Sequence, residues 1–327
     1  MILVTGGAGY IGSHTLLELE FSGLKYVVLD DVVNGHREAV RGAPLVVGDL
    51  SDRALLEQTL KKHSVDTVIH FAARACVGES VEQPAKYVRD NSVGMFHLLE
   101  AMRATGVRRF IFSSTCAVYG VPESVPILES ESRKPISPYG FTKRFCEEML
   151  EAYCNAYQFA VVALRYFNAA GSDPEGRLGE WHEPETHLIP RILRSVLGGL
   201  DETFAVFGTD YPTRDGTCIR DYIHVSDLAR AHRLALDHLR PGSFQAFNLG
   251  TGRGTSVLEV LAAAEKVTGR KVKYEVHGRR AGDPPELVAG ASLAGRALGF
   301  EARYPDIDSI VAHAFKWLKT HPRGYST

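Results

Sequence analysis

Three side chains of this 327-residue chain are of the types that together can remove a proton from an alcohol: Thr115, Tyr139 and Lys143. Tyr139 and Lys143 are four residues apart, so on a helix they lie on the same face. A free tyrosine has a pKa of about 10, too high for a base at neutral pH. One cation about 4 Å away stabilises the phenolate by about 4 kcal/mol at an effective dielectric constant of about 20, or about three pKa units. Lys143 is expected to supply such a cation against the opposing effect of burial, and the Thr115 hydroxyl to hydrogen-bond the reacting oxygen.

The surroundings of the Tyr-x-x-x-Lys pair decide its interpretation, because such pairs are common on ordinary surface helices. Ser137-Pro138 precedes the pair and is typical of a helix start, and the predicted helix runs to about residue 156. Thr115 ends the run Ser113–Thr115, directly after the apolar segment Arg109–Phe112, which is a predicted strand. A hydroxyl at a strand end beside this helix favours a catalytic role for the pair.

A glycine-rich turn near the start of the chain predicts a site for a dinucleotide. Gly6, Gly9 and Gly12 stand between the apolar run Ile2–Val4 and a segment of helical length, Tyr10–Ser22. Glycines between a strand and a helix allow a tight turn and a close approach of the backbone to a pyrophosphate. The helix start adds free N–H groups and the positive end of the helix dipole, which favour a diphosphate.

Asp30 is the acid expected to hold the adenosine ribose of that dinucleotide. It follows the predicted strand Tyr26–Leu29 and comes 18 residues after Gly12, close to the spacing of the ribose-binding acid in dinucleotide folds. A carboxylate accepts hydrogen bonds from a diol and repels a 2′-phosphate, so NAD is predicted in preference to NADP. Asp31 adds a second acid and outweighs the nearby Arg37. The alternative interpretation of Asp30 is a turn residue at a strand end.

The elements that position these residues alternate between strand and helix. The further strands expected are 44–47, 67–71 and 247–249, and the further helices are 52–62 with Ser51 as its N-cap, about 84–105, 187–198 ended by Gly198-Gly199, 226–239, 255–268 and 307–319. Such alternation predicts right-handed crossovers and an α/β fold with a doubly wound parallel sheet. Ligands bind beyond the carboxyl ends of the strands in such sheets, so Gly6, Asp30, Phe71 and Ser113–Thr115 are expected to share one crevice.

Composition and charge narrow the class of protein. The hydrophobic content of 45%, the charged content of 23% and the net charge of −2 are ordinary for a soluble globular protein, and predict no nucleic-acid or membrane partner. No apolar run approaches the length of a membrane span and no signal peptide precedes the first strand, so a cytoplasmic location is expected. The five cysteines are odd in number and the thirteen histidines form no H-E-x-x-H or Cys/His cluster, so no metal site is predicted.

Separated motifs along nearly the whole chain resemble the extended short-chain dehydrogenases/reductases and, within them, the UDP-glucose 4-epimerases. These motifs are Thr5–Gly12, Phe71–Ala73 with Val77–Ser80, Asp90-Asn91, Ser113–Gly120, Tyr139–Lys143, Leu164–Asn168, Phe207–Pro212, Arg220–Val225 and Arg280–Asp283. The resemblance implies a Rossmann-type NAD-binding domain (1–167 plus about 221–250) and a smaller α/β domain for a UDP-hexose (about 168–220 plus 251–327). It also implies a homodimer in which the helices at about 84–105 and 139–156 pair with their mates in a four-helix bundle.

The resemblance also assigns roles to individual residues. The catalytic residues it implies are Thr115, Tyr139 and Lys143. The cofactor residues it implies are Gly6, Gly9, Tyr10, Ile11, Gly12, Asp30, Asp31, Asn34, Asp49, Leu50, Phe71, Ala72, Ala73, Asn91, Ser113, Tyr139, Lys143 and Tyr166. The substrate residues are Thr115, Tyr139, Asn168, His187, Leu188, Phe207, Arg220, Val257, Arg280, Asp283 and Leu287. Three positions depart from some members of the family: Ala75 replaces a lysine, His187 an asparagine and Leu287 a tyrosine.

Enzymes of this kind first oxidise C4 of a nucleotide sugar, and the later steps distinguish them. The 4,6-dehydratases place Asp-Glu directly after the strand-end threonine, where this chain has Cys116-Ala117. Hydride return to C4 after the keto-sugar turns over gives the C4 epimer, so UDP-glucose and UDP-galactose are the expected pair. A UDP-uronate 4-epimerase is the alternative, and the small Leu287 favours UDP-N-acetylhexosamines as further substrates. A non-catalytic NAD-sensing regulator on this fold is expected to lose Tyr139 or Lys143.

Overall fold

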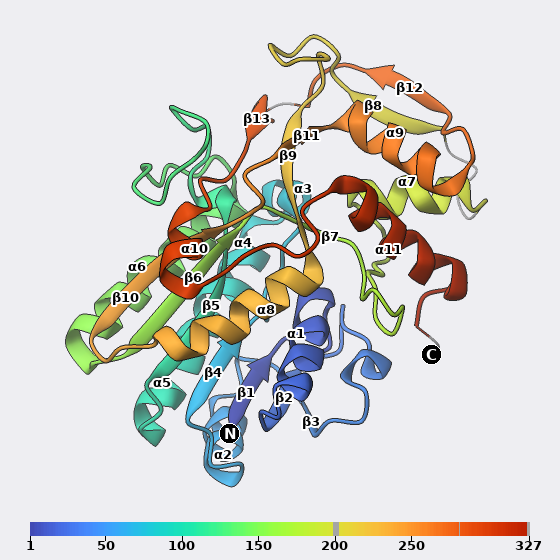
Figure 1. Cartoon of the computed structure of the whole chain (residues 1–327). Helices are drawn as coiled ribbons and strands as arrows, with labels where there is room; N and C mark the ends of the chain where they lie inside the picture. Colours follow the sequence, from blue (N-terminus) through green and yellow to red (C-terminus); the bar gives the residue numbers. More distant parts are fainter. Residues whose placement is uncertain (199–202, 281, 326–327) are drawn as a thin grey trace.

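The computed structural model describes residues 1–327 apart from 199–202, 281 and 326–327 (Figure 1). Its larger sheet has seven strands in the order β3-β2-β1-β4-β5-β6-β10, and all neighbours run parallel. The strands are β1 (Ile2–Thr5), β2 (Tyr26–Asp30), β3 (Leu45–Val47), β4 (Thr67–His70), β5 (Arg109–Thr115), β6 (Ala160–Tyr166) and β10 (Ser243–Leu249). The chain order reverses between β1 and β4, so a crevice for a ligand is expected beyond their carboxyl ends.

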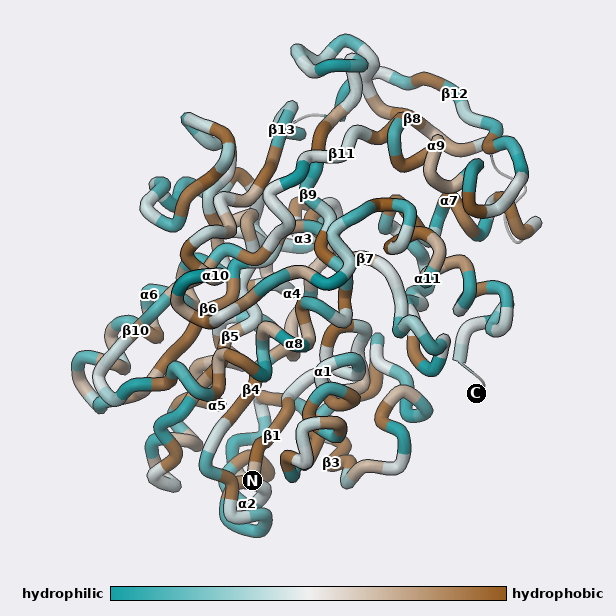
Figure 2. The backbone as a smooth tube through the Cα atoms, in the orientation of Figure 1, coloured by the Kyte–Doolittle hydropathy of each residue, from teal (hydrophilic) through white to brown (hydrophobic). Residues whose placement is uncertain are grey.

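Helices cover both faces of this sheet. One face packs against α1 (Tyr10–Phe21), α8 (Val225–Ala235) and α10 (Ser292–Leu298), and the other against α2 (Arg53–Lys62), α5 (Gly94–Thr105) and α6 (Pro138–Tyr157). The strands are therefore apolar on both sides, and Figure 2 shows hydrophobic residues concentrated along them while the outer turns are hydrophilic. This architecture is a doubly wound, Rossmann-type α/β fold, which confirms the prediction.

A smaller α/β unit follows the large sheet (Figure 1). A four-stranded sheet joins β7 (Asn168–Ala170), β9 (Ile219–His224), β11 (Gly254–Ser256) and β13 (Glu286–Leu287), and a second sheet pairs β8 (Phe204–Phe207) with β12 (Tyr274–His277). The helices of this unit, α7 (Leu188–Val196), α9 (Val257–Thr268) and α11 (Ile307–Thr320), share a core that includes the buried Trp317. The division into two domains stays a prediction, and α10 packs with the core of the large sheet although it was assigned to the second domain.

The long helical segment predicted for residues 84–105 contains a π-helical turn. A short helix α3 (Val77–Glu82) precedes it, and α4 (Pro84–Tyr87) continues through a π-helical turn, Val88–Val93, into α5. The wider turn carries Asn91, whose side chain bonds the backbone of Arg74 and the hydroxyl of Thr142. The prediction of a long helical segment over about 84–105 is therefore confirmed, and the π-helical turn within it is a local insertion that hydropathy does not report.

Other boundaries differ from the prediction for backbone reasons. The N-cap of α2 is Asp52 and not Ser51, because the Asp52 carboxylate accepts the Leu55 N–H at 2.9 Å. β5 continues past Phe112 to Thr115, because its polar end still pairs with β6. Gly199, expected to help end α7, lies outside the described residues. Among the described helices, none combines the length and the apolar character needed to cross a membrane.

Candidate active site

The glycine-rich turn between β1 and α1 leaves no room for larger side chains. A Cβ at Gly6 would lie 2.4 Å from the backbone nitrogen of Ala72, and one at Gly12 would lie 2.2 Å from the carbonyl oxygen of Gly6. Gly6 also has a φ of +73°, which residues with side chains rarely adopt. Gly9 is the N-cap of α1, and no side chain caps this helix. The turn thus offers a close backbone approach and free N–H groups, as a pyrophosphate requires.

Asp30 ends β2 beside this turn, and two backbone groups fix its carboxylate. The N–H of Ala8 donates to Oδ2 at 2.9 Å, and the N–H of Val32 donates to Oδ1 at 2.8 Å. Burial raises the pKa of Asp30, and these N–H groups partly offset that effect. Each carboxylate oxygen has lone pairs left for the hydroxyls of a ribose, so the geometry suits the predicted role.

Arg74 contacts three polar residues on the other side of the crevice, and its role was not predicted from the sequence. Its Nε donates to the Asp90 carboxylate at 3.0 Å, and its NH2 group lies 3.4 Å from that of Asp31. Its backbone N–H donates to Oδ1 of Asn91 at 2.8 Å, and the Asn91 amide donates back to its carbonyl at 3.0 Å. Arg74 therefore links two predicted cofactor residues, Asp31 and Asn91, directly before Ala75, where some relatives carry a lysine.

The remaining predicted cofactor residues follow the strand ends or open α1. They are Tyr10, Ile11, Asn34, Asp49, Leu50, Phe71, Ala72, Ala73, Ser113 and Tyr166. Four of their side chains already have partners: the Tyr10 hydroxyl donates to the Gly171 carbonyl at 2.6 Å, the hydroxyls of Ser113 and Tyr166 bond each other, and the Asp49 carboxylate accepts the Ser51 N–H at 2.7 Å. Tyr10 therefore offers a ligand its backbone and not its hydroxyl.

The end of β5 meets the start of α6 at the predicted catalytic residues. The Lys143 ammonium donates to the backbone carbonyl of Ser113 at 2.8 Å. Tyr139 and Thr115 are buried and interact closely enough for Thr115 to affect the pKa of Tyr139, and Oγ1 of Thr115 accepts the Ala117 N–H at 3.1 Å. The three side chains chosen from the sequence therefore lie together, one on the strand and two on one face of the helix.

Burial is the largest effect on the pKa values of Tyr139 and Lys143. Burial raises the pKa of Tyr139 well above its usual value, the neighbouring Tyr166 raises it further, and the side chain of Thr115 offsets this only in part. Burial also lowers the pKa of Lys143 from 10.5 to about 8. Burial is thus the largest effect on the pKa of Tyr139, and the Lys143 ammonium is directed at Ser113; the lowering of that pKa by Lys143 together with an oxidised nicotinamide stays a prediction.

A buried ion-pair network supports the strand end from behind, and the sequence analysis missed it. Glu147 lies four residues after Lys143 on the same face of α6 and is fully buried. Its carboxylate accepts from Arg165 at 2.6 and 2.9 Å, from Arg133 at 2.8 Å and from the Ser114 hydroxyl at 2.6 Å. Burial opposes its ionisation, but these donors hold the pKa of Glu147 below its usual value. The network joins α6 to the strands that carry the catalytic residues.

Strand β9 organises the predicted substrate residues of the smaller unit. Arg220 lies on β9, bonds the Asp283 carboxylate and is paired with Leu287 of β13. Arg280 places its guanidinium 4.1 Å from the ring centroid of Phe207. Ala281, inside the predicted Arg280–Asp283 motif, lies outside the described residues. The two arginines and the acid thus occur on neighbouring segments, as the resemblance implies.

A pocket beside β7 gathers three further substrate residues. It is lined by Asn168, Ala169, Ala170, Glu180, His187, Leu188, Ile189, Pro190 and Tyr222. His187 is the N-cap of α7 and Leu188 its first residue. Leu287 is half-buried against a cluster that includes Cys116, next to Thr115, whereas Val257 packs against the core of the smaller unit. Asn168, His187 and Leu188 therefore share one cavity, and Leu287 lies toward the catalytic strand end.

Comparison with known proteins gives consistent similarities. Residues 2–250 match the model of the NAD dependent epimerase/dehydratase family. The chain is 50% identical over 327 residues to a UDP-glucose 4-epimerase of Halalkalibacterium halodurans, covering 100% of this chain and 98% of that one. A structure of UDP-glucose 4-epimerase from Brucella ovis in complex with NAD has a TM-score of 0.92 and 52% identity, covering 96% of this chain and 97% of that one. The Bifidobacterium longum enzyme in complex with NAD⁺ and UDP has a TM-score of 0.94 and 38% identity, with 99% of each chain covered.

Proposed function

The chain belongs to the NAD-dependent epimerase/dehydratase family, and we propose that it interconverts UDP-glucose and UDP-galactose by inverting C4 of the sugar. The observation that carries this proposal is the group formed by Thr115, Tyr139 and Lys143 at the end of β5, beside the glycine-rich turn. UDP-glucose 4-epimerases that match the chain over its full length support the same reaction.

NAD is the cofactor, and the crevice fits it. The tight backbone around Gly6 and Gly12 suits a diphosphate, and the fixed carboxylate of Asp30 suits an unphosphorylated ribose diol. When bound, NAD supplies an oxidised nicotinamide that takes up the hydride from C4 and returns it. We assign Asp31 and Asn91, linked by Arg74, to the other side of the same cofactor site.

The chain's own residues handle the proton of the C4 hydroxyl. In the proposal Tyr139 accepts this proton as the phenolate, which the positive charges of Lys143 and of a bound oxidised nicotinamide would favour against burial, and Thr115 hydrogen-bonds the same oxygen at the strand end. Lys143 is anchored by the Ser113 carbonyl, and below a pH of about 8 it keeps a positive charge beside these hydroxyls. Glu147 acts on this group only by fixing α6 against β5 and β6, so it is a positioning residue.

The residues after Thr115 favour epimerisation over dehydration. A dehydratase needs a further acid or base to release the C6 hydroxyl, and the positions that would supply it are Cys116 and Ala117. Burial raises the pKa of the Cys116 thiol to about 12, and Ala117 has no titratable group. Neither side chain can donate a proton at neutral pH, so the simplest outcome is return of the hydride to C4.

We assign the UDP part of the substrate to the smaller unit. Asn168, His187 and Leu188 line the pocket beside β7. Arg220 and Arg280 suit a diphosphate, because guanidinium groups bind phosphate oxygens in a fixed bidentate geometry. Asp283, which bonds Arg220, would accept from a ribose hydroxyl. Phe207, beneath Arg280, offers an aromatic face to the base.

We also propose that UDP-N-acetylglucosamine is a substrate. Leu287 lies where some relatives carry a tyrosine, and it is half-buried beside Cys116 near the catalytic threonine. Leucine is smaller than tyrosine and has no hydroxyl, so an acetamido group at C2 of the sugar can use the space. A pocket change of this size discriminates by about 1–3 kcal/mol, or about 10–200-fold.

We further propose a homodimer in a reducing cytoplasm. Large apolar side chains are exposed on the segment from α4 to α5 and on the adjacent α6: Val88, Val93, Phe96, Phe141 and Phe145. A second copy that packs the same faces together would bury them in a four-helix bundle. All five cysteines are free thiols, which suits the cytoplasm. Light scattering should give a dimer mass that falls to that of a monomer in Phe96→Glu/Phe145→Glu, while the exposed Val276→Glu control should stay dimeric.

Conversion of UDP-glucose by the purified chain tests the reaction directly. Tyr139→Phe removes the proton acceptor and keeps the ring, so kcat should fall by about 10²–10⁴. UDP binding should survive, because Arg220 and Arg280 are unchanged. Tyr157→Phe, an exposed tyrosine on the same helix, is the matched control and should keep full activity. A wild type that binds NAD but converts no UDP-sugar would instead indicate a regulator, and near-normal turnover by Tyr139→Phe would contradict the catalytic assignment.

A further inference from the structure

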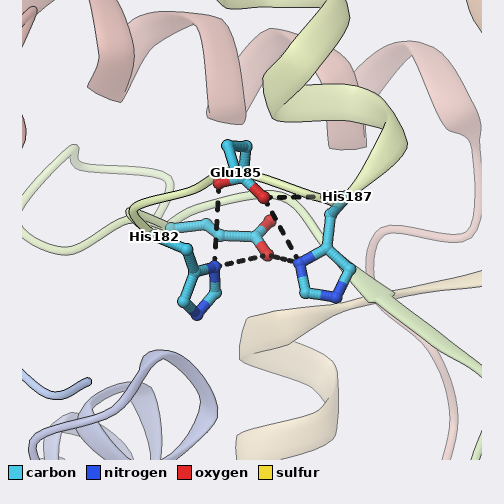
Figure 3. Close-up of side chains that lie close together, drawn as sticks. His182, Glu185 and His187 are labelled. Carbon is cyan, nitrogen blue, oxygen red and sulfur yellow. Dashed lines mark hydrogen bonds and ion pairs between the residues drawn. The ribbon is translucent and has the colours of Figure 1, made fainter. Parts of the chain in front are cut away.

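Four side chains of one segment converge outside the catalytic strand end. Glu180, His182, Glu185 and His187 lie between β7 and α7, and one nitrogen or oxygen of each falls within 4.8 Å of all the others. Figure 3 shows His182, Glu185 and His187 pointing toward one another. No metal site was predicted because the chain has no H-E-x-x-H or Cys/His cluster. This set has a different spacing, Glu-x-His-x-x-Glu-x-His.

The distances between nitrogen and oxygen atoms in this cluster can be compared with the distances between ligand atoms around a tetrahedral zinc ion. Oε1 of Glu180 lies 2.7 Å from Nδ1 of His187 and 3.6 Å from Nδ1 of His182. Oε2 of Glu185 lies 3.7 Å from Nδ1 of His182. Zinc binds nitrogen and oxygen at about 2.0–2.1 Å in a tetrahedron, which gives edges of about 3.3–3.4 Å between ligand atoms. The separations of 3.6 and 3.7 Å are close to such an edge, whereas the 2.7 Å pair and any pair near the 4.8 Å limit would have to shift by about 0.6–1.5 Å for all four atoms to surround one ion.

The hydrogen bonding of the cluster points to a missing cation. Nδ1 of His182 and Oε2 of Glu185 are buried and have no hydrogen-bond partner among the residues that the structure describes, and Oε1 of Glu180 makes no hydrogen bond of good geometry although it contacts Nδ1 of His187 at 2.7 Å. The other oxygen of Glu185 accepts the N–H groups of Thr186 and His187 at 2.8 and 2.9 Å, so Oε2 is held toward the centre. Buried polar atoms are almost always paired, and two facing carboxylates need positive charge between them.

We propose that Glu180, His182, Glu185 and His187 form a structural site for a divalent metal of the zinc class. Two imidazoles and two carboxylates are a donor set that zinc and cobalt accept, whereas magnesium and calcium prefer oxygen alone. A dication would neutralise the two carboxylates with both imidazoles neutral. Since the protein fills all four positions, the ion would cross-link the segment and fix the residue that follows it, Leu188, in the pocket beside β7.

Protonation of both histidines is the competing explanation for how the negative charges of the two carboxylates are balanced. If both imidazoles are protonated, they balance the two carboxylates without a metal, and the facing Glu180 does raise the pKa of His187 well above its usual value. The two explanations differ in what they bind, so metal binding decides between them independently of the proposed epimerase activity.

The experiment uses the untagged full chain, stripped with a chelator and titrated with Zn²⁺ and, separately, Co²⁺. We expect one equivalent of each ion per chain, visible absorption bands typical of tetrahedral Co²⁺, and quenching of tryptophan fluorescence by Co²⁺. The fluorescence is informative because the chain has two tryptophans: Trp181 lies between two of the ligands, and Trp317 packs beside it at 6.4 Å between ring centroids.

Substitution of single residues tests whether the metal binds at these four side chains. Glu180→Gln and His182→Asn should each weaken binding by about 100-fold or more, since even residues that only orient metal ligands cost 10–100-fold. Glu183→Gln is the matched control: this glutamate lies in the same segment, but it is exposed and pairs with Arg194. It should bind like the wild type. The proposal is overturned if the wild type binds no ion at micromolar concentration, or if tight binding survives in both ligand variants.

Discussion

Replacing Glu147 by glutamine tests whether the buried network behind the catalytic strand end holds α6 in place. The substitution keeps the shape of the side chain and removes its charge. It leaves the buried Arg165, which donates to both carboxylate oxygens, without a counter-charge, whereas Arg133 keeps its pair with Glu151 at 3.1 Å. The Ser114 hydroxyl loses a charged acceptor as well. We expect loss of stability and a lower kcat, because Ser114 directly precedes Thr115.

The magnitude follows from burial. Breaking a buried pair by removing one partner costs about 3–5 kcal/mol, because an uncompensated charge stays in the interior. Unfolding entropy is about 2.1 cal/mol/K per residue, or about 0.7 kcal/mol/K for a chain of 327 residues unfolding as one unit. The melting temperature of Glu147→Gln should therefore fall by about 4–7 °C in a calorimetric or fluorescence melt.

Glu148→Gln is the matched control, one residue further along the same helix. Glu148 pairs with Arg144 at 2.7 Å, but both side chains are exposed, so its loss should cost less than about 0.5 kcal/mol. The pH dependence should differ too. Because the folded state lowers the pKa of Glu147, its stabilisation is present above the ordinary value of 4.5 and is lost as the pH falls through the lower folded-state pKa. Equal melting temperatures for the two variants would refute the reasoning.

Two further results are expected. Leu287→Tyr should lower the ratio of kcat/KM for UDP-N-acetylglucosamine to that for UDP-glucose by about 10–200-fold, and an unchanged ratio, or no turnover of the acetylated sugar by the wild type, would exclude the proposed role of Leu287. NAD should be the nucleotide released by denaturing the purified protein, because the hydride returns in every turnover and Asp30 repels a 2′-phosphate; NADP in that extract would contradict the role of Asp30.

Features that depend on local patterns were predictable from the sequence. The glycine spacing, the apolar runs and the acid after the second run located the crevice, because strand ends in a parallel sheet meet at one edge. The spacing of Tyr139 and Lys143 placed both on one helical face, and the structure joins them to Thr115 at the end of β5. Their assignment to substrate and cofactor remains a proposal.

Features that depend on partners distant in the chain were not predictable. Nothing near Arg74 indicates that it bridges Asp31 and Asp90, and nothing near Glu147 indicates its bonds to Arg165. The extent to which burial raises the pKa of Tyr139 was not predictable for the same reason, since that burial depends on how α6 packs. Charge and hydroxyl patterns give residue types, but tertiary packing sets their dielectric surroundings.

The pairing of β10 with β6 has a consequence for how the chain is made. β6 is an almost fully buried strand, and one of its edges is covered only when β10 arrives, after β7, α7, β8 and β9 of the smaller unit have been synthesised. Until then that edge presents unpaired backbone groups, which are a template for aggregation. A fragment that stops near residue 167 would keep this edge uncovered, so we expect it to aggregate when it is expressed without the rest of the chain.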